Sequence, residues 1–355
     1  MRLVPDAPTA VSTRRCRGAV PALLAAIALS VTPLVGSAQT VVKLATLVPE
    51  GSVWHEILEN QAERWESAVD GSVDVRIYPG GVGGDDPAVV RKMRIGQFQG
   101  AALSVEGLVE IDEAFALFQM PLFFQSPAEV FYVLDALTDV LRARLDAKGF
   151  VLVNWGYGGW VRLYSTDPIR SVADLRGQKT FLWGGEERAT RIYRSQGLQP
   201  VGLAATDIMM ALQTGMIDAM ATSPLAALSF QWYRLTGYQL EPGIAPLIGG
   251  TVLTKQAWNR LSAEQRTALL ATAPGAWHRL QVDVSRAEEE AIAVMRERGL
   301  EVTTVDLDAP GWKEVTEGLA DGYRRDIVPT DVYDLGRRAR DAYRSGRTGA
   351  ASGGM

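Results

Sequence analysis

Cysteine is almost absent from this sequence, because Cys16 is the only one among 355 residues. It lies near the N-terminus, before an apolar stretch that is typical of a cleaved signal. The chain that remains after such a cleavage contains no cysteine. We therefore expect no disulfide, no thiol nucleophile and no metal site built on cysteine.

Histidine is nearly as scarce, and His55 and His278 lie in different segments. A catalytic triad would need one of them beside a serine and a carboxylate, and no Gly-x-Ser-x-Gly motif supports one. The glycine-rich stretches 80–84 and 156–159 lack the spacing and the Lys-Ser/Thr of nucleotide-binding loops, so both are interpreted as tight turns. Glu288-Glu289-Glu290 is interpreted as a solvated helix face. We expect both histidines at helix surfaces, no enzymatic activity, no cofactor and no metal.

Long apolar runs are missing except at the N-terminus. Arg14, Arg15 and Arg17 precede an apolar stretch at 22–35, and Gly36-Ser37-Ala38 follows it. The stretch is shorter than the roughly 20 residues of a membrane-spanning helix. This arrangement predicts a signal peptide over 1–38, cleaved after Ala38, with an uncleaved anchor as the alternative. The paired arginines leave Sec and twin-arginine export both open.

Basic residues are outnumbered once the signal is removed. Residues 39–355 contain 32 basic and 40 acidic side chains, a net charge near −8. This balance argues against nucleic acid or an anionic membrane surface as the main partner. The length of about 317 residues suggests two domains.

Strand and helix patterns alternate along the chain and predict an α/β fold. Apolar residues recur at helical spacing over 53–68, with Gln61 as the exception on that face. The other expected strands are at 41–48, 73–78, 99–104, 150–155, 180–183, 217–221, 251–254 and 300–305. The other expected helices are at 87–95, at 127–147, after a cap at Thr206-Asp207, and over most of 257–298. The last of these should start near a capping box at Ser262–Gln265 and should be kinked or broken at Pro274-Gly275.

Tryptophan is abundant, with nine in the chain. Trp54, Trp155 and Trp183 lie at or just beyond the carboxyl ends of expected strands, where ligands bind in α/β proteins. Trp160 and Trp232 lie near other loops or strand ends. Each could be a core residue, but their coincidence favours a binding cleft.

A series of short motifs resembles one family along residues 42–328. The motifs are Lys43-Leu44-Ala45-Thr46, Pro49-Glu50-Gly51-Ser52-Val53-Trp54-His55, Ile77-Tyr78-Pro79-Gly80-Gly81, Ile95-Gly96-Gln97, Leu122-Phe123-Phe124 and Ala211-Leu212-Gln213-Thr214-Gly215-Met216-Ile217-Asp218-Ala219. In this order and spacing the chain is similar to the solute-binding proteins of tripartite ATP-independent periplasmic (TRAP) transporters.

The resemblance implies a two-lobed periplasmic binding protein of type II-like fold, with crossing strands and a long helix that spans both lobes. The expected boundaries are 39–162 plus about 251–290 for lobe I and 163–250 plus about 291–335 for lobe II. Residues 336–355 are expected to form a tail whose end is disordered. The implied role is to capture a small molecule between the lobes, in the periplasm, and to deliver it to the permease subunits in the membrane.

One departure from the family concerns the ligand. Members typically place an arginine in a Gly-x-Lys-Ile-Arg strand, where it clamps a carboxylate bidentately. Here Phe181 stands at that position, at the end of 177–181, and the asparagine of a Glu-Asn-Pro motif is missing after Asp218. We therefore expect an apolar, aromatic or lipid-like ligand, with an organic acid held by Arg162 as the alternative. The predicted ligand-binding residues are Trp54, Trp155, Trp160, Arg162, Phe181, Trp183, Met209, Thr222, Ser223 and Trp232, and Met210 is expected beside Met209.

The sequence also resembles the branch of the family that pairs with a tetratricopeptide-repeat periplasmic partner, so such a partner is a further expectation. Two functions from other classes remain open. One is a periplasmic enzyme that reuses the fold, and the other is a scaffold whose cleft is filled by side chains.

Overall fold

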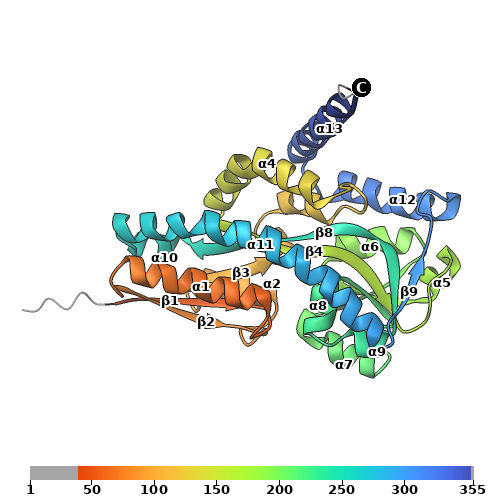
Figure 1. Cartoon of the computed structure of the whole chain (residues 1–355), viewed down its shortest axis with the longest axis horizontal. Helices are drawn as coiled ribbons and strands as arrows, with labels where there is room; N and C mark the ends of the chain where they lie inside the picture. The colour runs from red at the N-terminus through yellow and green to blue at the C-terminus, as the bar shows by residue number, and fades with distance from the viewer. Residues whose placement is uncertain (1–38, 353–355) are drawn as a thin grey trace, which may run out of the picture. The chain divides into compact units, whose positions relative to one another are not determined.

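The computed structural model describes residues 39–352 (Figure 1). The predicted signal peptide at 1–38, with its cleavage after Ala38, and residues 353–355 of the predicted tail lie outside this range. Within it, no helix has both the length and the apolar character that crossing a membrane requires.

One mixed sheet of nine strands runs through the described residues, in the order β2-β1-β3-β8-β4-β7-β5-β6, with β9 paired to β8. Strands β2, β1 and β3 are mutually parallel, as are β7, β5 and β6. Strands β4 and β8 are antiparallel to each other, β4 is antiparallel to β7, and β8 is antiparallel to β3. The strands are β1 (Thr40–Thr46), β2 (Val73–Tyr78), β3 (Gly100–Ser104), β4 (Phe150–Ser165), β5 (Lys179–Trp183), β6 (Gln199–Leu203), β7 (Ala219–Thr222), β8 (Tyr238–Thr254) and β9 (Glu301–Thr304).

The helices that connect and cover these strands mostly begin at polar caps. The side chains of Ser52 and Ser126, for example, accept backbone N–H groups at the first turns of α1 and α4. The helices are α1 (Val53–Ala68), α2 (Asp86–Arg94), α3 (Val105–Ile111), the 3₁₀ helix η1 (Glu113–Gln119), α4 (Pro127–Ala147), α5 (Val172–Gly177), α6 (Glu187–Ser195), the 3₁₀ helix η2 (Ala205–Asp207), α7 (Ile208–Gln213), α8 (Pro224–Ser229), α9 (Tyr233–Thr236), α10 (Lys255–Arg260), α11 (Ala263–Glu297), α12 (Pro310–Asp326) and α13 (Thr330–Ser352).

Strands β4 and β8 connect the two halves of the sheet. They pair along their whole length, from Phe150 opposite Thr254 to Ser165 opposite Tyr238. One end of β8 pairs with β3, and the far end of β4 pairs with β7. We call the part around β1–β3 lobe I and the part around β5–β7 lobe II. Both crossing strands are longer than the strands predicted at 150–155 and 251–254.

The tight turn predicted at 156–159 is wrong, because these residues lie inside β4. The pairing with β8 is irregular between Tyr157 and Trp160, and Gly159 has φ +103°. The glycines therefore allow an irregular register within a strand and do not reverse the chain.

Helix α11 is continuous over 35 residues, roughly 50 Å at 1.5 Å per residue. It packs against α1 in lobe I, against β4 and against α8 in lobe II (Figure 1). The predicted capping box is confirmed, since Ser262 and Gln265 each bond the other's backbone N–H. Of the kink or break predicted at Pro274-Gly275, the break is wrong, because Pro274 lies inside the helix without ending it, and the kink stays a prediction. The contacts on either side of the proline outweigh its missing N–H.

The C-terminal segment is helical further than the sequence predicted. Helix α13 starts at Thr330, packs against α4 and continues to Ser352, within the segment expected to be a tail. The lobe boundaries predicted from the sequence remain a prediction.

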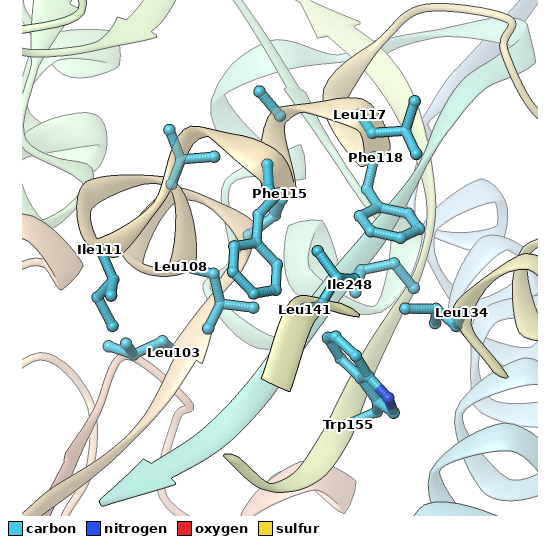
Figure 2. Packing of buried hydrophobic residues seen from close by; sticks show 14 of the residues in the cluster. Leu103, Leu108, Ile111, Phe115, Leu117, Phe118, Leu134, Leu141, Trp155 and Ile248 are labelled. Carbon is cyan, nitrogen blue, oxygen red and sulfur yellow. The ribbon is translucent and has the colours of Figure 1, made fainter. Parts of the chain in front are cut away.

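The main core lies where α3, η1 and α4 cover the crossing strands. Phe115 and Phe118 of η1, Leu141 of α4 and Ile248 of β8 are buried together there (Figure 2). The core thus holds the central part of the sheet, from which both lobes extend.

Gly159 offers a test of this arrangement. A Cβ at Gly159 would collide with the carboxylate of Glu288 from α11, at a φ that L-residues rarely adopt. We expect Gly159→Ala to lower the free energy of unfolding by about 2 kcal/mol or more, measured by urea denaturation. Gly177→Ala is the control, because a Cβ there meets nothing within 4 Å, and it should change stability by about 0.5 kcal/mol at most. Equal effects of both substitutions would contradict the close approach of α11 to β4.

Candidate functional site

A cavity of about 400 Å³ lies between the lobes. Lobe I contributes the end of β1, the first half of α1 and the end of β3, and lobe II contributes β5, β7, α7 and the aromatic residues after α8. The middle parts of β4 and β8 line it as well. Its volume falls in the range of cavities that enclose a small organic molecule.

Among residues 39–352, none that lines this cavity is a lysine, arginine, histidine, aspartate or glutamate. Over residues 39–352 there is also no group of three or more potential metal-ligating side chains. The lining itself therefore offers apolar contacts and neutral hydrogen-bonding groups.

The lobe II wall is aromatic. Phe181 and Trp183 point to the same face of β5, since they are two residues apart, and their ring centroids lie 5.8 Å apart. Phe230 and Trp232 are stacked at 4.4 Å. Met209 of α7 completes this wall. Rings fixed by mutual packing present a rigid apolar surface at little entropic cost.

The lobe I wall is more polar. Gln61 of α1 and Asn154 of β4 line the cavity and are both almost fully buried. The amide of Gln61 donates to the Oδ1 atom of Asn154 at 3.0 Å. Thr46 at the end of β1 also lines the cavity, but its hydroxyl donates to the carbonyl of Ala102. The two walls therefore differ in chemistry.

The structure brings part of the predicted site together. Trp54, Phe181, Trp183, Met209, Thr222 and Trp232 line the cavity, whereas Trp155, Trp160, Arg162 and Ser223 do not.

Trp155 is a core residue. It is 7% exposed, its ring tilts against Phe115, and its indole N–H donates to Thr138 at 2.9 Å (Figure 2). It lies within β4 and not at a strand end, because the strand continues ten residues beyond it. Ser223 is buried as the N-cap of α8, and Met210, expected beside Met209, points outward at 69% exposure.

Arg162 is bound to two carboxylates of the protein. Its Nε lies 2.6 Å from Glu241 of β8, and its Nη1 lies 3.7 Å from Glu288 of α11. Nη1 also donates to the carbonyl of Trp160. Across the β4–β7 ladder Arg162 stands opposite Thr222, which lines the cavity. Arg162 is therefore paired with a strand residue of the cavity wall, but its guanidinium charge is already compensated by Glu241 and Glu288.

Glu288 contradicts the interpretation of 288–290 as a solvated face. It is 8% exposed and accepts the backbone N–H of Trp160 at 2.7 Å. Burial raises the pKa of its carboxyl to about 7, although the Trp160 N–H and Arg162 act against the rise. Glu289 and Glu290 are exposed, as expected.

Two smaller expectations also need correction. His278 is exposed, but His55 is 6% exposed and its Nδ1 lies 3.3 Å from Glu59. Asp207 makes no side-chain bond at the start of α7, and Thr206 instead lines the cavity.

Gln61, Asn154 and Phe230 are site residues that sequence reasoning missed. Gln61 and Asn154 did carry a signal, because each is a lone amide within an apolar helix face or strand. Such a residue needs a buried partner, and the sequence does not say which. Phe230 gave little signal, because its stacking on Trp232 depends on the backbone between α8 and α9.

Comparisons with known proteins identify a matching family and several similar proteins. Residues 44–326 match the family described as bacterial extracellular solute-binding protein, family 7. A solute-binding protein of Chromohalobacter salexigens is 23% identical over 214 residues, which cover 60% of this chain and only 63% of that relative. The 2,3-diketo-L-gulonate-binding periplasmic protein YiaO of Escherichia coli is 23% identical over 266 residues, 74% of this chain and 79% of its own length.

Among solved structures, a TRAP periplasmic solute binding protein from Pseudomonas putida F1 with bound D-glucuronate is similar, with a TM-score of 0.77 at 22% identity. The match covers 84% of this chain and 96% of that one. The predicted fold class is thereby confirmed: an α/β periplasmic binding protein of two lobes, with the long helix α11.

The pKa of Glu288 leads to a prediction about stability. Between the ordinary pKa of 4.5 and the folded value of about 7, the folded protein holds a proton that the unfolded chain has lost. Glu288 should therefore lower the free energy of unfolding as pH rises through this window, by up to about 3 kcal/mol. Urea denaturation of wild type and Glu288→Gln from pH 4 to pH 8 measures this contribution as the difference between the two. A difference that stays constant over the window would contradict it.

Proposed function

The chain belongs to family 7 of the bacterial extracellular solute-binding proteins, the TRAP type, and from this premise we propose that it captures a small organic acid between its lobes and presents it to a TRAP permease. The observation that carries the capture step is the cavity of about 400 Å³ lined from both lobes. The family is one of solute-binding proteins, which agrees with the expectation that the chain is not an enzyme.

The periplasm is the proposed location. The basic and apolar pattern of residues 1–38 supports export, and the name of the Escherichia coli relative describes it as periplasmic. Cleavage after Ala38, the permease subunits and the tetratricopeptide-repeat partner remain expectations from the sequence and the family resemblance.

The relatives favour an organic acid over a neutral apolar molecule. The Escherichia coli protein is named for 2,3-diketo-L-gulonate, and the Pseudomonas structure holds D-glucuronate. Both ligands are acids, so the organic-acid alternative has better support than the neutral apolar ligand that was expected first.

The cavity argues for an acid with a large apolar part. The described residues that line it include no charged side chain, and one wall contains Phe181, Trp183, Phe230 and Trp232. Burying about 200 Å² of apolar ligand surface there would contribute about 5 kcal/mol before the cost of association. A polyhydroxylated acid would leave much of that wall unused.

Arg162 is the cation that we propose for the carboxylate. It stands opposite Thr222 of the cavity wall, on the same side of the sheet. A ligand carboxylate would compete for it with Glu241 and Glu288, which now hold it. Because the folded pKa of Glu288 is about 7, a fraction of its carboxyls is neutral near pH 7 and compensates Arg162 less.

A ligand panel tests the class of ligand. We expect phenylpropanoate to change the tryptophan fluorescence of the protein with a Kd at least tenfold lower than that of D-glucuronate, because the ring buries apolar area against the aromatic wall. Phenylpropanamide, the neutral counterpart, should bind more weakly than the acid. Equal binding of acid and amide would favour the neutral apolar interpretation, and binding of D-glucuronate alone would contradict the apolar body.

Substitution of Arg162 tests the carboxylate contact. We expect Arg162→Gln to weaken phenylpropanoate by about tenfold or more, because a charge-assisted pair is lost, and to change phenylpropanamide by less than about twofold. Calorimetric titration of both compounds measures the ratio, and Arg162→Lys should keep part of the preference. A parallel loss for acid and amide, or no loss for the acid, would exclude Arg162 as the carboxylate partner.

A further inference from the structure

Gln61 is a buried amide on the apolar face of α1. Its neighbours on that face, Ile57, Leu58 and Trp65, are all buried hydrophobic residues, and Gln61 itself is 6% exposed. A buried amide costs free energy unless its polar atoms are bonded. The hydrogen bonds of Gln61 therefore show what this position can still bind.

The hydrogen bonds around Gln61 determine how its amide is oriented. The hydroxyl of Thr272 gives its single hydrogen to the carbonyl of Leu269 at 2.6 Å, so it can only accept from Gln61. The atom of Gln61 that faces Thr272, at 3.2 Å, is thus the donor Nε2. The same nitrogen donates to Oδ1 of Asn154 at 3.0 Å, which uses both of its hydrogens.

Asn154 is oriented in the same way. Its Nδ2 faces the carbonyl of Trp155 at 2.9 Å, and a carbonyl can only accept. Its Oδ1 is occupied by Gln61. One hydrogen of Nδ2 has no acceptor among residues 39–352, and Oε1 of Gln61 receives no donor from that part of the chain.

The two amides are hydrogen-bonded to each other and both line the cavity, and they leave one acceptor atom without a donor and one N–H without an acceptor. A carboxylate offers only acceptors and would place its oxygens against the carbonyl of Gln61. A hydroxyl or an amide group offers a donor and an acceptor and satisfies both open positions. Because the pair is buried and uncharged, it discriminates by matching hydrogen bonds and not by charge.

We propose that Gln61 and Asn154 form a specificity pair that recognises a neutral donor–acceptor group of the ligand, such as a hydroxyl. This inference rests on the proposed function and deepens it. The hydroxyl lies at the lobe I wall, and the apolar body of the acid lies against the aromatic wall of lobe II. The substrate class is therefore a hydroxylated acid with an apolar or aromatic body.

Calorimetric titration of the purified protein tests the pair with three probes: phenylpropanoate, its para-hydroxy analogue and its para-fluoro analogue. Fluorine is close to the hydroxyl in size but cannot donate. We expect wild type to prefer the hydroxy over the fluoro analogue by about five- to tenfold, the value of one well-made hydrogen bond. Gln61→Met should reduce this preference to less than about twofold, because it removes the acceptor and releases Asn154.

Leu58→Met is the matched control, because Leu58 lines the same cavity from the same helix. It should keep the preference. Asn154→Ala removes the donor and should lose the preference as Gln61→Met does, which keeps the test valid if one variant fails to fold. The inference is overturned if the preference survives in Gln61→Met, or if both analogues weaken equally, as a merely structural role predicts.

The para-hydroxyphenyl and para-fluorophenyl propanamides separate this inference from the proposed function. Suppose that no acid binds, but that wild type prefers the hydroxy amide over the fluoro amide and Gln61→Met does not. The organic-acid proposal then fails and the specificity pair stands. If acids bind without preference for the hydroxyl, the specificity pair fails and the organic-acid proposal stands. If neither acids nor amides bind wild type, both are overturned.

Discussion

The ladder of backbone hydrogen bonds between β4 and β8 is the connection on which the rest of the molecule depends. The two strands carry the chain between the lobes, and β3 and β7 extend the sheet from their opposite ends. Glu288 of α11 accepts the backbone N–H of Trp160 and so connects the helix to this ladder. The neighbouring residue is Gly159, where a Cβ would collide with the Glu288 carboxylate. The lobes, the spanning helix and the cavity walls are therefore held by one shared set of contacts, and the ligand site lies beside them.

The chemistry of the cavity depends on which side chains of the crossing strands and the two lobes line it. The charged groups nearest in register, Arg162 and its carboxylates, neutralise one another at the crossing strands and stay out of the lining. The lining includes an aromatic wall in lobe II and a pair of amides in lobe I. Such a site gains affinity from buried apolar area and specificity from a few neutral hydrogen bonds.

Much of the fold could be predicted from local pattern. The helix at 53–68, the strand at 73–78 and the capping box at Ser262–Gln265 agree with the structure, because each is set by residues that are near in sequence. The crossing strands were predicted too short, since glycines at 156–159 resemble a turn until β8 pairs with them. Pro274 likewise carries a local signal to break the helix, and contacts along α11 override it. In each case the missing information was a distant partner.

The candidate site can likewise be divided into features that the sequence determines and features that depend on distant contacts. The sequence by itself determined that residues 39–355 contain no cysteine and only two histidines, which lie far apart in the chain, and that nine tryptophans are available for a core or a binding cleft. The resemblance adds the expectation that Phe181 stands where members of the family place an arginine. Only the tertiary structure decided that Trp155 packs in the core, that Arg162 is held by Glu241 and Glu288, and that Gln61 meets Asn154 and Thr272 across 93 and 211 residues of sequence. The physical reason is that a side chain missing from the sequence is missing from every fold that the chain could adopt. Which hydrogen-bond donors and acceptors remain free in a site depends instead on the distant residues that the fold brings against them.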